Sequence, residues 1–200
     1  MDAEQTLREC ARWKILALLA RLLPDGAPEG VIAADLVDAG MAISDTQLRA
    51  QLAYLRDRDL IIGRQHRGGD SWALTWYGID LVEYTTDCQP GIARAAGGVS
   101  DAVRERYVIR WRLMRCLYLA GGLPTAEGIC ARHLADMGYA SDPHTVRRQL
   151  DYLERRSMVE IVDRAATHWL ARLTRPGTDV VEYSVDCRPG IARPPKLRSE

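Results

Sequence analysis

A block of 21 residues occurs twice in this chain, and it constrains the fold more than any other feature. Residues 74–94 read LTWYGIDLVEYTTDCQPGIAR, and residues 173–193 read LTRPGTDVVEYSVDCRPGIAR. Fourteen of the 21 positions are identical, and the block is the second half of a unit of roughly 98 residues present in two copies. Two copies at that period indicate a duplicated domain, because a solenoid needs three or more shorter repeats. We therefore expect one domain in residues 1–97 and a second in residues 98–200.

The composition is that of a globular protein, with 47% apolar and 27% charged residues and no phenylalanine. No apolar run approaches the length of about 20 residues that a membrane-spanning helix needs. The polar N-terminus, MDAEQTLREC, lacks the features of a signal peptide. We therefore expect a cytoplasmic protein of a bacterium or of its virus, without contact to a membrane.

No residue pattern indicates catalysis. The five cysteines form no CxxC pair, and none has zinc-ligand spacing to the four histidines. The chain contains no nucleophile elbow, phosphate-binding loop or metal motif. The sequence thus predicts a protein that is not an enzyme and that needs neither metal nor cofactor, with reduced and buried cysteines.

The two copies differ in charge, although the whole chain is neutral. Residues 1–97 hold 10 Lys and Arg against 14 Asp and Glu, a net charge of −4, and residues 98–200 hold 17 against 13, a net charge of +4. A polyanion should therefore prefer the second copy.

Both copies predict the same order of elements. Apolar residues at helical spacing predict a long helix, two shorter helices joined by a tight turn, and a short fourth helix after a β-hairpin. Gly40 and Gly138 are suited to end the second helices, and Ser44 and Asp142 are suited to begin the third. The expected ranges are 6–23, 31–39, 46–59, 60–75 and 77–84 in the first copy, and 100–119, 127–137, 142–156, 158–173 and a helix from 176 in the second.

This layout is that of a winged-helix domain, in which the hairpin tip is the wing. We therefore expect a mainly α fold with small β-hairpins, built as two tandem winged-helix domains with a sheet of two or three strands each. The short segment 95–99 is expected to link the domains, and residues 194–200 to form a basic C-terminal tail.

The second half of each copy resembles a family of small winged-helix proteins of Mu-like phages and prophages. The resemblance rests on the pattern W-x-L-T-x-x-G-x-D-V followed by PGI-x-RP, from which the second copy departs because Trp169 lies four residues before Leu173, while Trp72 lies two before Leu74. Its residues are Trp72, Leu74, Thr75, Gly78, Asp80, Pro90, Gly91, Ile92 and Arg94, and Trp169, Leu173, Thr174, Gly177, Asp179, Val180, Pro189, Gly190, Ile191, Arg193 and Pro194. Proteins of that family have one domain, so the fused tandem is a departure, and the resemblance implies a fold but no activity.

A winged helix binds DNA by placing its third helix in the major groove while the wing touches phosphate. The outward positions of the third helix hold Thr46, Ala50, Ala53 and Asp57 in the first copy and His144, Arg148, Asp151 and Arg155 in the second. Long cationic side chains suit phosphates and guanine edges. The candidate contacts to double-stranded DNA are His144, Arg147, Arg148, Arg155, Arg156, Arg164, Arg49 and Arg67.

The same residues allow other interpretations. Exposed arginines are most often a solvated helix face, and Arg147 and Arg148 lie near enough to Asp151 and Glu154 in sequence to pair with them. Thr46, Ala50, Ala53 and Asp57 are candidates for contact with a protein partner or a second copy of the chain. The sequence therefore predicts a phage-type DNA-binding protein, a regulator or an accessory factor in DNA transactions, with a protein-binding adaptor as the alternative.

The PGIAR segments and the repeated aromatic residues also have two interpretations. The segments are either anion-binding loops or straps across their own domain, with Ile92 and Ile191 buried and Cys88 and Cys187 beneath them. Tryptophan and tyrosine at matched positions are typical of core residues, with stacking on single-stranded bases as the alternative. We favour the strap and the core.

Overall fold

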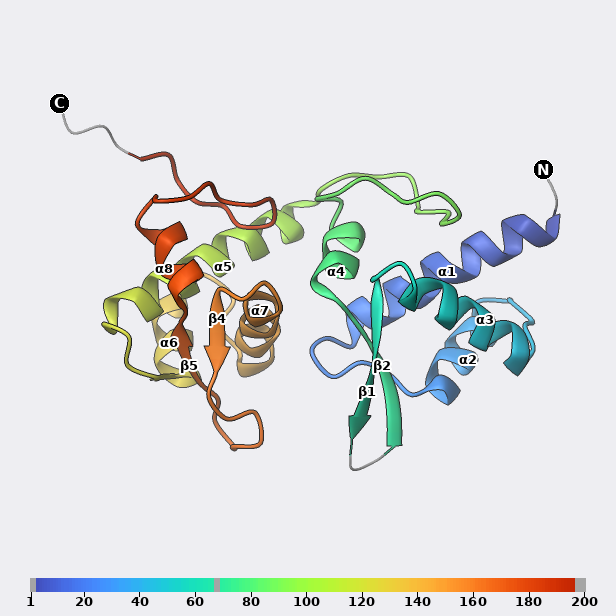
Figure 1. The fold of residues 1–200 in the computed structure, drawn as a ribbon, viewed down its shortest axis with the longest axis horizontal. Helices are drawn as coiled ribbons and strands as arrows, with labels where there is room; N and C mark the ends of the chain where they lie inside the picture. The colour runs from blue at the N-terminus through green and yellow to red at the C-terminus, as the bar shows by residue number, and fades with distance from the viewer. Residues whose placement is uncertain (1–2, 67–68, 197–200) are drawn as a thin grey trace. The chain divides into compact units, whose positions relative to one another are not determined.

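The computed structural model of the protein describes residues 3–66 and 69–196. The chain divides into two compact units, Met1–Gly98 and Val99–Glu200, so that the boundary lies one residue after the predicted one. Each unit is mainly helical and holds one small antiparallel sheet (Figure 1). In the described part of the chain, no helix is both long and apolar enough to cross a membrane.

The first unit begins with three helices, followed by a hairpin and a short helix. They are α1 (Ala3–Arg21), α2 (Glu29–Asp38), α3 (Asp45–Arg56), β1 (Ile61–His66), β2 (Gly69–Leu74) and α4 (Trp76–Val82). Within the predicted hairpin the sequence Gly68-Gly69-Asp70 is typical of a turn, but Gly69 and Asp70 belong to β2. Arg67, a predicted DNA contact, lies outside the described residues.

The second unit has the same order of helices and one additional strand. Its elements are α5 (Asp101–Leu119), β3 (Thr125–Ala126), α6 (Glu127–Ala135), α7 (Pro143–Arg155), β4 (Val159–Ile161), β5 (Leu170–Leu173) and α8 (Arg175–Val181). The strands lie in the order β3-β5-β4, so the sheet has three strands where the first unit has two. Residues 197–200 of the predicted basic tail lie outside the described residues.

Capping residues explain where the third and fourth helices begin. The Ser44 side chain accepts a hydrogen bond from the Gln47 amide, and the Gln47 side chain accepts one from the Ser44 amide. At the start of α7 the Asp142 carboxylate accepts a hydrogen bond from the Thr145 amide. The hydroxyls of Thr75 and Thr174 cap α4 and α8 and also donate to a backbone oxygen of the loop before the hairpin. The threonine of the repeated block therefore joins the fourth helix to the end of the third.

Each unit has its own apolar core, formed where the first helix packs against the third helix and the sheet. In the first unit the core includes Ile15, Leu16, Leu19, Leu52 and Leu55, and in the second Leu113, Leu117, Val146, Leu150 and Leu153. Of the aromatic residues expected in the cores, Trp111, Tyr152 and Trp169 are buried, whereas Trp13, Tyr54 and Trp72 of the first copy are only half-buried. The rings of Trp13 and Tyr84 meet edge to face at 6.2 Å and those of Trp111 and Tyr183 at 6.1 Å.

Candidate nucleic-acid interface

The candidate interface consists of α7 and the hairpin that follows it. Asp142 caps α7, and Pro143 occupies its first turn, where a proline costs no hydrogen bond. Val146, Leu150 and Leu153 are buried and fix the inward face of the helix. His144 is exposed at the start of the helix, and Arg148 is half-buried one turn later. The helix therefore presents these two predicted residues on the side away from the core.

Arg147 forms an ion pair with the second helix of its unit. Its guanidinium donates to both carboxylate oxygens of Glu127 at 2.6 Å, and it also donates to the backbone oxygen of Thr167 at 2.5 Å. The Glu127 side chain is only 5% exposed. The hydrogen bonds from Arg147 hold the pKa of Glu127 below its ordinary value, against the opposing effect of burial. Arg147 thus ties α7 to α6 and to the hairpin.

The position of the Asp151 side chain contradicts the sequence prediction. Asp151 was expected on the outward face, but its side chain is fully buried. Arg155 donates to one of its carboxylate oxygens and Arg164, from the hairpin loop, to the other, both at 2.7 Å. Helical spacing placed Asp151 beside the apolar face, and the loop with Arg164 then covers it. Two arginines therefore surround a carboxylate where an open cationic face was expected.

Arg164 also donates to Glu154, with its Nε 3.0 Å from a carboxylate oxygen. Although burial opposes the charge, the hydrogen bonds and the negative charges of Glu154 and Asp151 raise the pKa of Arg164. Arg155 keeps 12% of its side chain exposed and Arg164 keeps 39%. The carboxylates that the sequence suggested as partners of Arg147 and Arg148 are thus engaged by Arg155 and Arg164.

Arg156 lies on a different side of the domain. Its guanidinium donates to the hydroxyl of Tyr152 and to the backbone oxygen of Pro189 at 2.5 Å. It therefore contacts the segment that ends the repeated block, and the structure does not bring it together with Arg147 and Arg164.

The first unit presents a less basic third helix. Thr46, Ala50 and Asp57 are exposed, Ala53 is half-buried, and Asp57 pairs with the adjacent Arg56. Arg49 matches Arg147 in position and likewise pairs with the second helix, at 3.2 Å from Glu29. This pair is more exposed than its counterpart, with 71% and 40% of the two side chains accessible.

The PGIAR segments cross their own domains, as the favoured interpretation predicted, but the expected burial of the cysteines holds only for Cys116 and Cys130, since Cys10, Cys88 and Cys187 are half-buried. We name residues 87–94 and 186–193 the straps. Ile92 and Ile191 are each 7% exposed, and the thiols of Cys88 and Cys187 lie half-buried against the backbone oxygens of these isoleucines. The last arginine of each strap donates to two backbone oxygens of its own unit, Arg94 to Leu81 and Thr86 and Arg193 to Val180 and Val185.

Sequence reasoning missed the arginines that anchor the straps from the first helix. Arg110 donates to the Gln149 side chain at 2.8 Å and to the Gly190 backbone oxygen at 3.0 Å, and its guanidinium lies 3.5 Å from the Tyr152 ring centre. The equivalent cluster joins Arg12, Gln51, Gly91 and Tyr54 with a nearly identical geometry. The signal was present in the sequence, because Arg-Trp and the paired glutamines recur at the repeat spacing.

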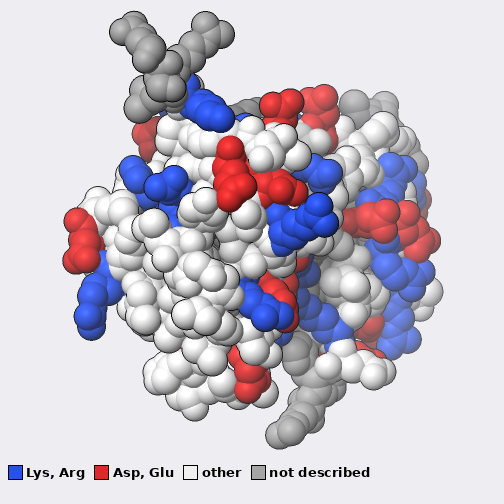
Figure 2. Space-filling model, turned by 60° about the vertical axis from the view of Figure 1, so that its left-hand side comes forward, with Lys and Arg blue, Asp and Glu red and all other residues white. Residues whose placement is uncertain are grey.

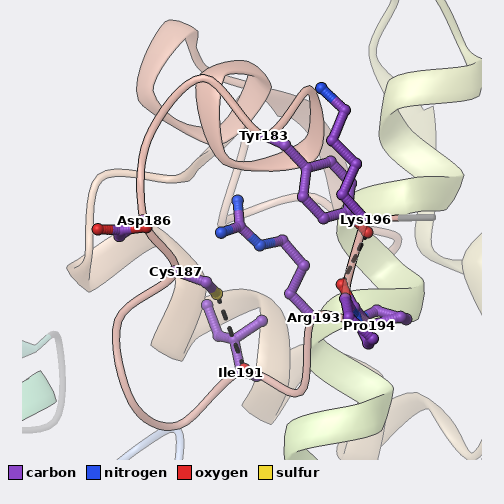
Figure 3. A pocket seen from close by; sticks show the side chains of 8 residues that line it. Tyr183, Asp186, Cys187, Ile191, Arg193, Pro194 and Lys196 are labelled. Carbon is purple, nitrogen blue, oxygen red and sulfur yellow. Dashed lines mark hydrogen bonds between the residues drawn. The ribbon is translucent and has the colours of Figure 1, made fainter. Parts of the chain in front are cut away.

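A surface pocket of about 570 Å³ lies beside the second strap (Figure 3). Tyr183, Asp186, Cys187, Ile191, Arg193, Pro194, Pro195 and Lys196 line it. Burial raises the pKa of the Cys187 thiol. Arg193 lies over the Tyr183 ring at 4.5 Å, so one face of the only aromatic ring in this lining is covered.

Among the described residues, no group of three or more histidine, cysteine, aspartate and glutamate side chains is placed to hold a metal ion. The chain matches no protein-family model, and no curated protein matches it in sequence.

Proposed function

We propose that the chain is a tandem winged-helix protein of the phage or prophage kind, and that its second unit binds duplex DNA. The order of the elements supports the winged-helix assignment. In each unit, a pair of helices joined by a short turn precedes a hairpin, and a short segment before the second helix pairs with the returning strand. The proposed role is binding without a catalytic step, in regulation or in another DNA transaction.

One observation carries the DNA proposal. α7 and its hairpin carry five arginines, Arg147, Arg148, Arg155, Arg164 and Arg172, against the four carboxylates of Asp151, Glu154, Glu160 and Asp163. At two of these positions the first unit has an alanine and an aspartate, Ala50 and Asp57. Clustered arginines with a net positive charge attract phosphate groups, and binding driven by the release of counterions from DNA weakens as the salt concentration rises.

A gel shift on random duplex DNA at 50 and 200 mM salt tests the proposal, with one charge introduced at matched positions of the two third helices. Arg148→Glu should weaken binding about tenfold or more, because it reverses a charge beside the phosphates. Ala50→Glu places the same side chain at the same helix position of the first unit and should change the affinity less than about twofold. The wild-type complex should weaken steeply between the two salt concentrations.

A specific observation favours the second candidate, a protein-binding adaptor. Leu119, Leu123 and Ile129 of the second unit are 69%, 70% and 59% exposed. On the face shown in Figure 2, basic and acidic side chains form mixed groups, and wide uncharged areas lie between these groups. If no duplex binds at the lower salt concentration, the adaptor function replaces the DNA proposal. If Ala50→Glu lowers the DNA affinity and Arg148→Glu does not, DNA binding belongs to the first unit.

A further inference from the structure

The two hairpins differ in how far their strands stay paired. In the first unit the ladder runs over six residue pairs, from Ile61 and Leu74 to His66 and Gly69. In the second unit it runs over three pairs and ends at Ile161 and Ala171. We name residues 162–169, which follow the shortened ladder, the second wing. Figure 1 shows the long ribbon of β1 and β2 and the short strands β4 and β5 with their looped tip.

Ion pairs and hydrogen bonds hold the second wing against α7. Arg164 of the wing donates to Asp151 at 2.7 Å and to Glu154, while Arg147 of α7 donates to the backbone oxygen of Thr167 at 2.5 Å. The wing is also braced internally, since the indole nitrogen of Trp169 donates to the backbone oxygen of Arg164 at 3.2 Å. Arg164 and Thr167 are therefore attached to α7 beyond the last ladder pair and beyond the hydrogen bond from the Val162 amide to the Leu170 oxygen.

The first unit keeps an arginine, Arg49, at the position of Arg147 but lacks the acidic residue and the second arginine of this attachment. Asp151 corresponds to Ala53, and its second partner, Arg155, corresponds to Asp57. A fully buried carboxylate between two guanidinium groups forms charge-assisted hydrogen bonds, which are the strong kind. Such a carboxylate occupies the donors that would otherwise bind a phosphate oxygen, because guanidinium groups recognise both anions through the same planar fork.

We propose that Asp151 and Glu154 form a clamp that closes the second wing on α7 and lowers the affinity of this face for duplex DNA. A phosphate can accept hydrogen bonds from Arg155 and Arg164 only when these arginines no longer donate to the two carboxylates. DNA binding must therefore open the wing. The inference rests on the proposed function for its DNA partner. The closure itself is a property of the protein alone and can be measured without DNA.

Limited trypsin digestion of the full chain measures the closure. Cleavage after Arg164 requires its guanidinium to leave the clamp and enter the protease, so the closed wing should protect this bond. Asp151→Asn should speed this cleavage, followed by mass spectrometry, about tenfold or more, because it breaks the ion pairs of a buried carboxylate. Because Asp151 is buried, the half-exposed Glu154 provides a second variant, Glu154→Gln, with the same expected direction.

Glu160→Gln is the matched control for charge. Glu160 lies in the same hairpin and pairs with Arg172 at 2.8 Å, but both side chains are nearly half exposed and neither belongs to the clamp. Each of the three variants removes one negative charge. Glu160→Gln should leave cleavage after Arg164 unchanged, and the clamp variants should gain more DNA affinity in the gel shift than this control does.

The outcomes separate the clamp from the proposed function. Unchanged cleavage after Arg164 in both clamp variants overturns the clamp, whatever the DNA result. Faster cleavage with a gain in DNA affinity no larger than that of Glu160→Gln overturns its inhibitory role. Faster cleavage in a protein that binds no DNA at low salt overturns the proposed function and leaves the closed wing as a structural feature.

Discussion

At the scale of single residues, the identical positions of the two copies are explained by the strap and the turns beside it. The arginine that ends each strap binds the backbone around the fourth helix, and a second arginine from the first helix binds the strap from below. Arg110 is 1% exposed, so its donors require the oxygens of Gln149 and Gly190. These residues maintain the fold of each unit, and they are not candidates for binding DNA.

The glycine of the repeated L-T-x-x-G pattern is required for a close approach of two backbone segments. A Cβ atom on Gly177 would lie 2.1 Å from the backbone oxygen of Met158, which cannot move without shifting the start of the hairpin. Gly177→Ala should therefore destabilise the second unit by about 1–3 kcal/mol, the usual cost of overpacking. The free energy of unfolding in urea measures this cost.

The same substitution at Gly128 should have the opposite sign. Gly128 lies in α6, and a Cβ atom there would have no neighbour within 4 Å. Gly128→Ala should stabilise the protein by up to about 1 kcal/mol, the difference in helix propensity between the two residues. Equal effects of the two substitutions would contradict the role assigned to Gly177.

The residue scale also shows where prediction from sequence succeeds and fails. The burial of Ile92 and Ile191 follows from apolar residues in an otherwise polar repeated segment, and the structure confirms it. The prediction that Asp151 is exposed was wrong. Helical periodicity gives the direction of a side chain around its own helix, but it does not show whether a later loop covers that side chain. The pairing of Arg147 with Glu127 depends on a contact between residues 20 positions apart, which periodicity does not contain.

At the scale of elements, an ion pair ties the second helix to the third in both units. Arg147 and Glu127 form the buried version of this pair, and Arg49 and Glu29 the exposed version. Because Arg147 lowers the pKa of Glu127 in the folded protein, the ionised carboxylate contributes stability at neutral pH. This contribution is present above the pKa of the unfolded chain, about 4.3, and is lost as the pH falls through the lower folded pKa.

Glu127→Gln should therefore cost stability at pH 7 and lose its effect in acid. The expected cost at pH 7 is about 1–3 kcal/mol, because the substitution leaves the charge of Arg147 without its carboxylate. Below the folded pKa the wild-type carboxyl is neutral too, so the difference between the two proteins should shrink. Urea unfolding at pH 7 and pH 3 measures it, with Glu29→Gln as the exposed control at less than about 1 kcal/mol.

The helices could be predicted within a few residues because their apolar spacing, caps and glycines agree. The strands were less accessible. β3 has only two residues, too few for an alternating pattern, and it pairs with β5 more than 40 positions later. The second hairpin has a shorter ladder and a wing attached to α7, and this attachment is again a contact between distant segments.

At the scale of the whole molecule, the two units share a plan and differ in charge. The first carries −4 and the second +4, and the differences include the third helices, where Ala50 and Asp57 stand in place of Arg148 and Arg155. Each unit contains its own core and a strap anchored by its own first helix. Because each unit has its own core, substitutions on the surface of one unit need not disturb the core of either. The two copies of the domain can therefore acquire different surfaces.

This separation predicts the behaviour of the two halves produced alone. Residues 1–98 and 99–200 should each unfold cooperatively, because each contains its complete core and its strap. The second half should bind duplex DNA, and at low salt about two- to tenfold more tightly than the full chain, since the acidic first half no longer repels the phosphates. At 150 mM salt the advantage should become small, because repulsion between exposed charges is screened beyond about 8 Å. Circular dichroism during heating and gel shifts at both salt concentrations measure these outcomes. Binding by the first half alone would reverse the assignment, and a second half that folds only within the full chain would show that its stability depends on the first.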